Sequence, residues 1–256
     1  ITDYDFPNGG VDVDIPITVT NNSTTYNVTE IGDEAFLAYN SSEKITSVII
    51  PMGITSIGQR AFQSNLLTSV IIPDSVTEIG SLAFAENTQL ASVVLSNNLQ
   101  VSSQASFQYC IINTINIPNS VTTIKSNAFF NNNLTSVTIP SSVTSVEVRA
   151  FMTNPLTCVV SENTSPPAIA MAVGGNTTLD TFGGSRPNID LSIPTGTAST
   201  YAAAQWTGFK SVTEGLTGTF VANNITYQIN PNPNSEVTIT DYNIAGGTSV
   251  TIPTTV

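Results

Sequence analysis

Apolar residues in the middle of the chain recur in a strand-like pattern. In LTSVTIPSSVTSVEVRAF, residues 134–151, Val137 and Ile139 alternate with Ser136 and Thr138. Successive side chains of a strand point to opposite faces, so this alternation indicates a strand with one buried and one solvent-facing side. We therefore predict a short strand that buries Val137 and Ile139 and leaves Ser136 and Thr138 facing outward.

Four further segments repeat this pattern with a period of about 22 residues. They are Ile45–Phe62, Leu67–Phe84, Leu90–Phe107 and Ile112–Phe129, and prolines end most of the strands: Pro51, Pro73, Pro118 and Pro140. A strand-and-turn unit at this spacing is typical of a solenoid, in which each repeat forms one coil. Burying six apolar side chains contributes on the order of 10 kcal/mol per coil. Ordering some 22 residues costs more, so we expect the coils to depend on stacking.

A polar position follows the phenylalanine of each coil by three residues. Its occupants are Tyr39, Asn65, Asn87, Cys110, Asn132 and Asn154. Asparagine at a tight bend can bond backbone groups that would otherwise be buried unpaired. We therefore predict a column of amides along the solenoid, in which Cys110 is a structural substitute for asparagine rather than a reactive thiol.

The second cysteine, Cys158, stands at an outward strand position two coils beyond Cys110. A separation of roughly 10 Å follows from the distance between stacked strands. This exceeds the reach of a disulfide, and we expect no bond between the two. The glycines Gly32, Gly58 and Gly80 recur as well, but Glu147 takes their place in a later coil, so we interpret them as compact turn residues.

The repeat loosens after about residue 160, and a cap follows. The segment TASTYAAAQW, residues 197–206, contains helix-forming alanines and predicts a short helix that closes the open end of the solenoid. As the only tryptophan, beside a cap, Trp206 is expected to pack there rather than form a platform for a ligand.

We expect four regions along the chain. Residues 1–30 form an N-terminal β cap or inter-module segment, and 31–160 the solenoid. Residues 161–215 form an irregular last coil with a C-terminal helical cap, and 216–256 a β segment that begins the next module.

Composition excludes several functions. The net charge is −12 with only six Lys and Arg, which are scattered, so a nucleic-acid partner is not expected. No apolar run approaches the roughly 18 residues of a membrane span. Histidine is absent, which removes the commonest general base and metal ligand. We expect no cofactor and no enzymatic activity.

The motif L-x-x-V-x-I-P-x-x-V-x-x-I-G-x-x-A-F-x-x-C/N resembles the BspA-like leucine-rich repeat family of bacterial surface proteins, also called the Treponema pallidum type. The resemblance covers about residues 31–214. It implies a β-rich solenoid with coils of about 22–23 residues, short parallel strands on one face, irregular or short helical segments elsewhere and capped ends. It also implies a secreted or surface-attached protein that binds proteins or other surface polymers. Some relatives are adhesins, and the family has no catalytic residues.

Calcium binding is an alternative at the N-terminus. Asp3, Asp5, Asp12 and Asp14 form two D-x-D pairs, and oxygen ligands suit calcium. A similar segment near the C-terminus, Ile239–Val256, keeps only the counterpart of Asp3. Because a defining calcium site would keep its charges, we favour a solvated acidic edge.

Candidate binding residues are those that face outward from successive strands. They are Ser47, Ile49, Ser69, Ile71, Ser92, Val94, Thr114, Asn116, Ser136 and Thr138. The exposed apolar side chains Ile49, Ile71 and Val94 suit contact with a partner. The alternative is that β-branched residues stand there only because they favour strands.

Three functions remain open. The first is a non-catalytic adhesion or protein-interaction module of a larger extracellular or cell-surface protein, with a host, neighbouring-cell or matrix protein as partner. The second is a structural spacer of a surface array, in contact with neighbouring modules of the same chain. The third is binding of a polysaccharide or another ordered surface by the Ser/Thr-rich strand face.

The two ends of the chain are similar. ITDYDFPNGGVDVDIPITV opens it and ITDYNIAGGTSVTIPTTV closes it. We expect the chain to be one module of a tandem array, whose gene continues beyond Val256 with a sequence like TNNSTTYNVTEIGDEAF. Sequencing the gene tests this expectation, and a stop codon directly after Val256 would count against it.

Overall fold

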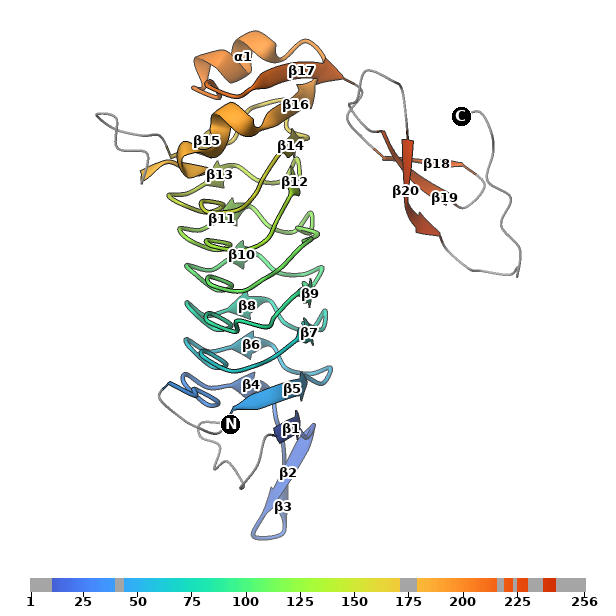
Figure 1. Ribbon diagram of the computed structural model, residues 1–256. Coiled ribbons are helices and arrows are strands. Elements are labelled where there is room, and N and C mark those ends of the chain that lie inside the picture. The colour runs from blue at the N-terminus through green and yellow to red at the C-terminus, as the bar shows by residue number, and fades with distance from the viewer. Residues whose placement is uncertain are drawn as a thin grey trace.

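The computed structural model describes residues 11–39, 44–170, 179–215, 219–222, 225–229 and 237–242. It confirms the predicted β-solenoid, with about eight turns stacked along one axis (Figure 1). The boundaries predicted for the four regions stay a prediction.

Two columns of parallel strands run along the solenoid. The longer strands are β1 (Val11–Asp14), β5 (Ile45–Ile49), β7 (Ser69–Ile71), β9 (Ser92–Val94), β12 (Ser136–Ile139), β14 (Cys158–Ser161), β16 (Asp190–Pro194) and β17 (Ser211–Gly215). The second column contains two-residue strands: β4 (Glu30–Ile31), β6 (Ser56–Ile57), β8 (Glu78–Ile79), β10 (Val101–Ser102), β11 (Thr123–Ile124), β13 (Ser145–Val146) and β15 (Ala168–Ile169). This second column lies in a part of the coil where irregular or helical segments were expected.

Two antiparallel sheets lie outside these columns. The first is the hairpin of β2 (Thr18–Asn21) and β3 (Thr24–Asn27), and the second comprises β18 (Thr219–Ala222), β19 (Ile225–Ile229) and β20 (Val237–Tyr242). The described residues also form the 3₁₀ helix η2 (Gly183–Asn188) and the helix α1 (Ala198–Ala203).

A column of stacked phenylalanine rings forms the centre of the core. Its members are Phe36, Phe62, Phe84, Phe107, Phe129, Phe151 and Phe182, all buried. Neighbouring rings are nearly parallel, and their centroid distances rise from 5.0 Å between Phe36 and Phe62 to 6.0 Å between Phe151 and Phe182. Each ring between Phe36 and Phe182 therefore packs against the rings of the coils before and after it, as a stack of mutually dependent coils requires.

The recurring glycines allow coils to approach closely. A Cβ atom on Gly58 would lie 2.5 Å from the backbone nitrogen of Asp33, and one on Gly80 would lie 2.4 Å from that of Gln59. Neither glycine has a positive φ. Their function is thus to permit backbone contact between coils rather than only to form a compact turn, which corrects the prediction. Glu147, the later counterpart, lies where the rings are more widely spaced.

The predicted amide column is confirmed. Asn87 accepts a hydrogen bond from the N–H of Leu67, which begins its own coil, at 3.2 Å. Its Nδ2 donates to the carbonyls of Phe84, in the same coil, and of Phe62, in the preceding coil, each at 2.9 Å. One side chain therefore closes its coil and links it to the neighbour. Asn65 and Asn154 repeat this arrangement. Asn132 differs only in that its bond within its own coil is to the carbonyl of Phe130.

Cys110 occupies the same column, as predicted. Its Sγ lies 3.4 Å from the carbonyl oxygen of Phe84, in the preceding coil. The N–H of Leu90, which begins this coil, donates instead to the backbone carbonyl of Asn87 at 2.9 Å. The backbone therefore remains satisfied although the amide is missing. Cys110 and Cys158 are both free.

The C-terminal cap contains the predicted helix and buries Tyr201 and Trp206. The hydroxyl of Tyr201 in α1 donates to the carbonyl of Asn163 and lies within hydrogen-bond distance of Ser161 Oγ, both at 2.7 Å. Trp206 is 1% exposed and donates to the carbonyl of Pro167 at 2.9 Å. The expectation that Trp206 packs in the cap is confirmed.

A buried ion pair stabilises the cap. The sequence did not indicate this pair. The guanidinium of Arg186 forms two contacts with the carboxylate of Asp180, at 2.9 and 3.1 Å. It also lies over the rings of Phe182 and Phe209 and donates to the carbonyl of Thr207. Because its donors are used and its charge is neutralised, this arginine can be buried at the end of the core.

Replacing Asn87 with alanine tests the amide column. The substitution leaves the N–H of Leu67 and the carbonyl of Phe62 without their side-chain partner inside the core. Since each unsatisfied buried group costs roughly 1–3 kcal/mol, we expect Asn87→Ala to lower the free energy of unfolding by about 3 kcal/mol. Chemical denaturation checks this.

Asn98→Ala is the matched control, because its side chain is exposed and donates to the carbonyl of Asp74 at the surface. We expect a loss below about 1 kcal/mol. Equal losses for the two variants would contradict the role given to Asn87.

Candidate functional site

The outer face of the longer strands is the candidate binding surface. Nine of the ten predicted residues are exposed there, and Thr138 is half-buried. The parallel pairing of β7 with β9 places Ser69 beside Ser92 and Ile71 beside Val94. β12 and β14 continue the face with Ser136 and Thr138. The strand ladders thus bring the predicted strand residues onto one face, while Thr114 and Asn116 are exposed outside any strand. The role of all ten residues in binding stays a prediction.

Three apolar side chains stand out on this face, and we call Ile49, Ile71 and Val94 the apolar ridge. They are 62, 66 and 52% exposed. The alternate residues of the same strands face the core, where Val70 and Val93 are buried. The ridge therefore presents apolar surface to solvent although the core needs none of it.

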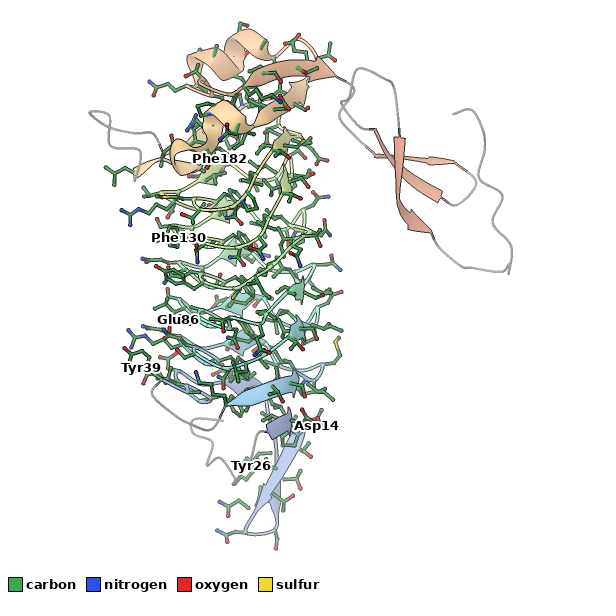
Figure 2. The ribbon with its side chains drawn as sticks, in the orientation of Figure 1. Asp14, Tyr26, Tyr39, Glu86, Phe130 and Phe182 are labelled. Atoms are coloured by element: carbon green, nitrogen blue, oxygen red, sulfur yellow. The ribbon has the colours of Figure 1, made fainter. Side chains whose placement is uncertain are left out.

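The N-terminal end of the face is acidic. The sequence predicted an acidic edge that contains Asp12 and Asp14, but not that a strand adds it to this face. β1 pairs in parallel with β5 and places Asp12 beside Ser47 and Asp14 beside Ile49. Asp12 accepts a hydrogen bond from Ser47 Oγ at 2.5 Å, and Asp14 is exposed at the end of the ridge (Figure 2).

A signal for this strand exists in the sequence. VDVDIP, residues 11–16, has the same ending as the other strands, since Ile15-Pro16 corresponds to Ile72-Pro73. The hairpin β2–β3 lengthens the distance from this Ile-Pro pair to the next one. The strand therefore falls outside the 22-residue period and was not recognised.

The coil around Thr114 and Asn116 differs from the expectation. Both residues are exposed, and Ile112 and Ile117 are buried as predicted, but no strand forms at 112–117. The N–H of Asn113 reaches the carbonyl of Ala91 at a long 3.5 Å. The coils on either side contain β9 (Ser92–Val94) and β12 (Ser136–Ile139), so this coil interrupts the column of longer strands.

Beyond this coil the face becomes polar and charged. Cys158 lies between Ser136 and Asp190 in the ladder. Hydrogen bonds from Lys210 and Ser211 lower the pKa of Asp190. Burial raises the pKa of the half-buried Cys158 thiol, and the carboxylate of Asp190 adds to this effect.

Among the described residues, no group of three or more His, Cys, Asp or Glu side chains is arranged to hold a metal ion. Asp3 and Asp5 of the calcium alternative lie outside the described residues. Within the described ranges, no helix is long and apolar enough to cross a membrane.

Comparison with known proteins identifies the family. The sequence model of the BspA type leucine-rich repeat region matches residues 17–133 and 100–165, with six copies of the repeat. The chain belongs to this family, whose members are surface proteins with a repeat fold used for protein interaction. No curated protein matches the chain.

Solved structures include similar proteins. A leucine-rich cell surface protein from Faecalibacterium prausnitzii is 22% identical over 78% of this chain and 65% of its own length, with a TM-score of 0.49. A leucine-rich repeat protein from Bacteroides ovatus is 17% identical, over 79% of this chain and 68% of its own, with a TM-score of 0.43. Because both TM-scores are below 0.5, the family assignment rests on the sequence repeat and not on these structures.

The two thiols should react very differently. Burial raises the pKa of Cys110 to about 12, while Cys158 is half-buried at the surface. We expect Ellman's reagent to label Cys158 slowly at pH 7. As long as the pH stays below the pKa of Cys158, the labelling rate should rise about tenfold for each unit by which the pH increases, because only the thiolate attacks. Cys110 should remain unlabelled in the folded protein up to pH 9.

The variant Cys158→Ser isolates Cys110. We expect no labelling of this variant until denaturant is added, and one thiol per chain afterwards. Rapid labelling of the folded variant at pH 8 would show that Cys110 is not a closed structural position.

Proposed function

We propose that the chain is a non-catalytic interaction module of a bacterial surface protein, and that it binds another protein through the apolar ridge. The observation that carries the proposal is the exposure of Ile49, Ile71 and Val94 on neighbouring strands. A solvated strand face does not require them, and contiguous exposed apolar side chains are typical of interaction sites. The extracellular location and the adhesive role are part of the proposal and follow the family.

The surroundings of the ridge favour a particular kind of partner. Asp12 and Asp14 border it at one end, and the chain carries a net charge of −12. An apolar protein segment flanked by Lys or Arg would contact the ridge while its cations face the carboxylates. Such complementarity speeds association and sets orientation more than it adds affinity.

An ordered lattice is a poorer fit for this face. A regular glycan or ice surface requires evenly repeated positions, whereas the strands are interrupted at 112–117 and the ring spacing varies from 5.0 to 6.0 Å. Along the row that begins with the apolar ridge, the side chains also change from isoleucine and valine to asparagine and threonine. These features count in favour of a protein partner.

A triple substitution of the ridge tests the proposal. The variant Ile49→Lys/Ile71→Lys/Val94→Lys places three charges where the partner would make apolar contact. We expect its binding to immobilised extracellular-matrix proteins, measured by surface plasmon resonance, to fall at least tenfold. Its thermal midpoint should hardly change, because the three side chains are exposed.

The matched control is Thr114→Lys/Asn116→Lys/Ser136→Lys, which adds the same charge to the polar half of the face. This control should bind like the unmodified chain. Unchanged binding by the ridge variant would refute the assignment of the ridge. If the unmodified chain binds neither the matrix proteins nor a cell surface, the result would contradict an interaction function and favour a structural spacer.

A further inference from the structure

The hairpin β2–β3 projects beyond the first coil and is exposed on both faces (Figure 1). Every residue of the two strands is exposed, including Val19 at 45% and Tyr26 at 53%. In the described part of the chain, neither strand pairs with a third. An isolated two-stranded hairpin is marginally stable at best, and a third strand would stabilise it.

The chain contains a second hairpin of the same design. TVTNNSTTYN, residues 18–27, corresponds to TFVANNITYQ, residues 219–228. The strand registers agree, because Thr18 pairs with Asn27 as Thr219 pairs with Gln228, and Val19 with Tyr26 as Phe220 with Tyr227. Two residues connect the strands in each case.

This second hairpin has acquired a third strand. β20 pairs antiparallel with β19, so that Gln228 lies opposite Thr238 and Thr226 opposite Asp241. β3 is the counterpart of β19, and its outer edge is the counterpart of the edge that β20 covers. The protein itself thus shows which kind of strand such an edge accepts.

The backbone of β3 is oriented to accept an added strand at its outer edge. The N–H of Val28 donates to the carbonyl of Ile17, and bonded pairs alternate along an antiparallel ladder. Val28, Tyr26 and Thr24 therefore direct their backbone groups toward β2, whereas Thr25 and Asn27 direct theirs away from it. Tyr26 lies on the hairpin beyond the solenoid, where another chain can approach (Figure 2).

We propose that the outer edge of β3 is a docking site for an antiparallel strand, and that its occupant is β20 of a second copy of this chain. Among the described strands, β20 lies at the border of its sheet and pairs only with β19. Docking would form a five-stranded sheet, β18–β19–β20–β3–β2, in which one strand stands between two hairpins of the same design.

The consequence is a directional assembly. The contact joins the C-terminal sheet of one copy to the N-terminal hairpin of the next, and these are different surfaces. Contacts of this kind repeat without closing unless the rotation happens to form a ring. This interaction is separate from the apolar ridge, which remains available along the side of the solenoid.

Sedimentation equilibrium of the full chain tests the proposal. From about 10 µM to about 1 mM, spanning micromolar and millimolar dissociation constants, we expect the average mass to rise above that of the monomer. Asn27→Pro removes an outward-facing donor of β3, and edge strands tolerate proline. It should weaken association at least tenfold.

The control is Thr20→Pro, which removes a donor from the opposite edge of the same hairpin. It should associate like the unmodified chain, and circular dichroism should show both variants folded. A chain that remains monomeric at 1 mM, or two variants that associate equally, would overturn the proposal.

A peptide gives a second measurement that needs no variant. Fluorescein-labelled SEVTITDYN, residues 235–243, should bind the unmodified chain and compete with its association, because a free copy of β20 can occupy the β3 edge. A shuffled peptide should not bind, and the ridge variant should bind the peptide normally. Equal binding of both peptides would contradict strand docking.

Discussion

The solenoid depends on satisfying the backbone at the bend that follows each phenylalanine. There the chain turns away from the core, and its carbonyls cannot reach solvent. Asn65, Asn87, Asn132 and Asn154 bond these carbonyls with one end of the amide and the first N–H of the coil with the other. Because the same amide reaches the preceding coil, closure of a coil and stacking of two coils are a single event. Stability should therefore be shared between neighbours, as in other repeat proteins.

The ends of such a stack need other solutions, since one face of the last coil has no neighbour. At the C-terminal end, Tyr201 and Trp206 cover the core and donate their polar hydrogens to the carbonyls of Asn163 and Pro167. The ion pair of Arg186 and Asp180 holds this cover in place. At the N-terminal end, β1 continues the strand face, and the hairpin β2–β3 extends beyond it.

The sequence predicted much of the repeat: the coil period, the buried and exposed strand positions and the amide column follow from short, recurring patterns. The capping helix follows from the alanines of a single segment. The second column of two-residue strands was not predicted, although it recurs along the solenoid. It did not predict the pairing of Arg186 with Asp180, because that contact occurs once and joins residues of an irregular segment. It also missed β1 on the strand face, since the inserted hairpin breaks the period there. It also predicted a strand at 112–117, where INTINIP keeps the pattern of the repeat, and no strand forms there.

For function, the division between constant and variable positions matters most. The leucine, proline and phenylalanine positions of the repeat are needed to form the coil and its core. The outward strand positions are not needed for the core. Their side chains vary along the stack, from the acidic Asp12 through the apolar ridge to the polar Thr138. Specificity can therefore change by substitution on the face while the core stays the same, which suits a family of surface interaction modules.

Hydrogen exchange of backbone amides most directly tests the claim that the amide column couples the coils. The N–H groups of Leu67 and Leu134, which donate to Asn87 and Asn154, should exchange among the slowest in the protein and at similar rates. In Asn87→Ala, protection should fall both at Leu67 and in the neighbouring coils. If the loss were confined to Leu67, or if these amides exchanged as fast as exposed loop positions, the account would be contradicted.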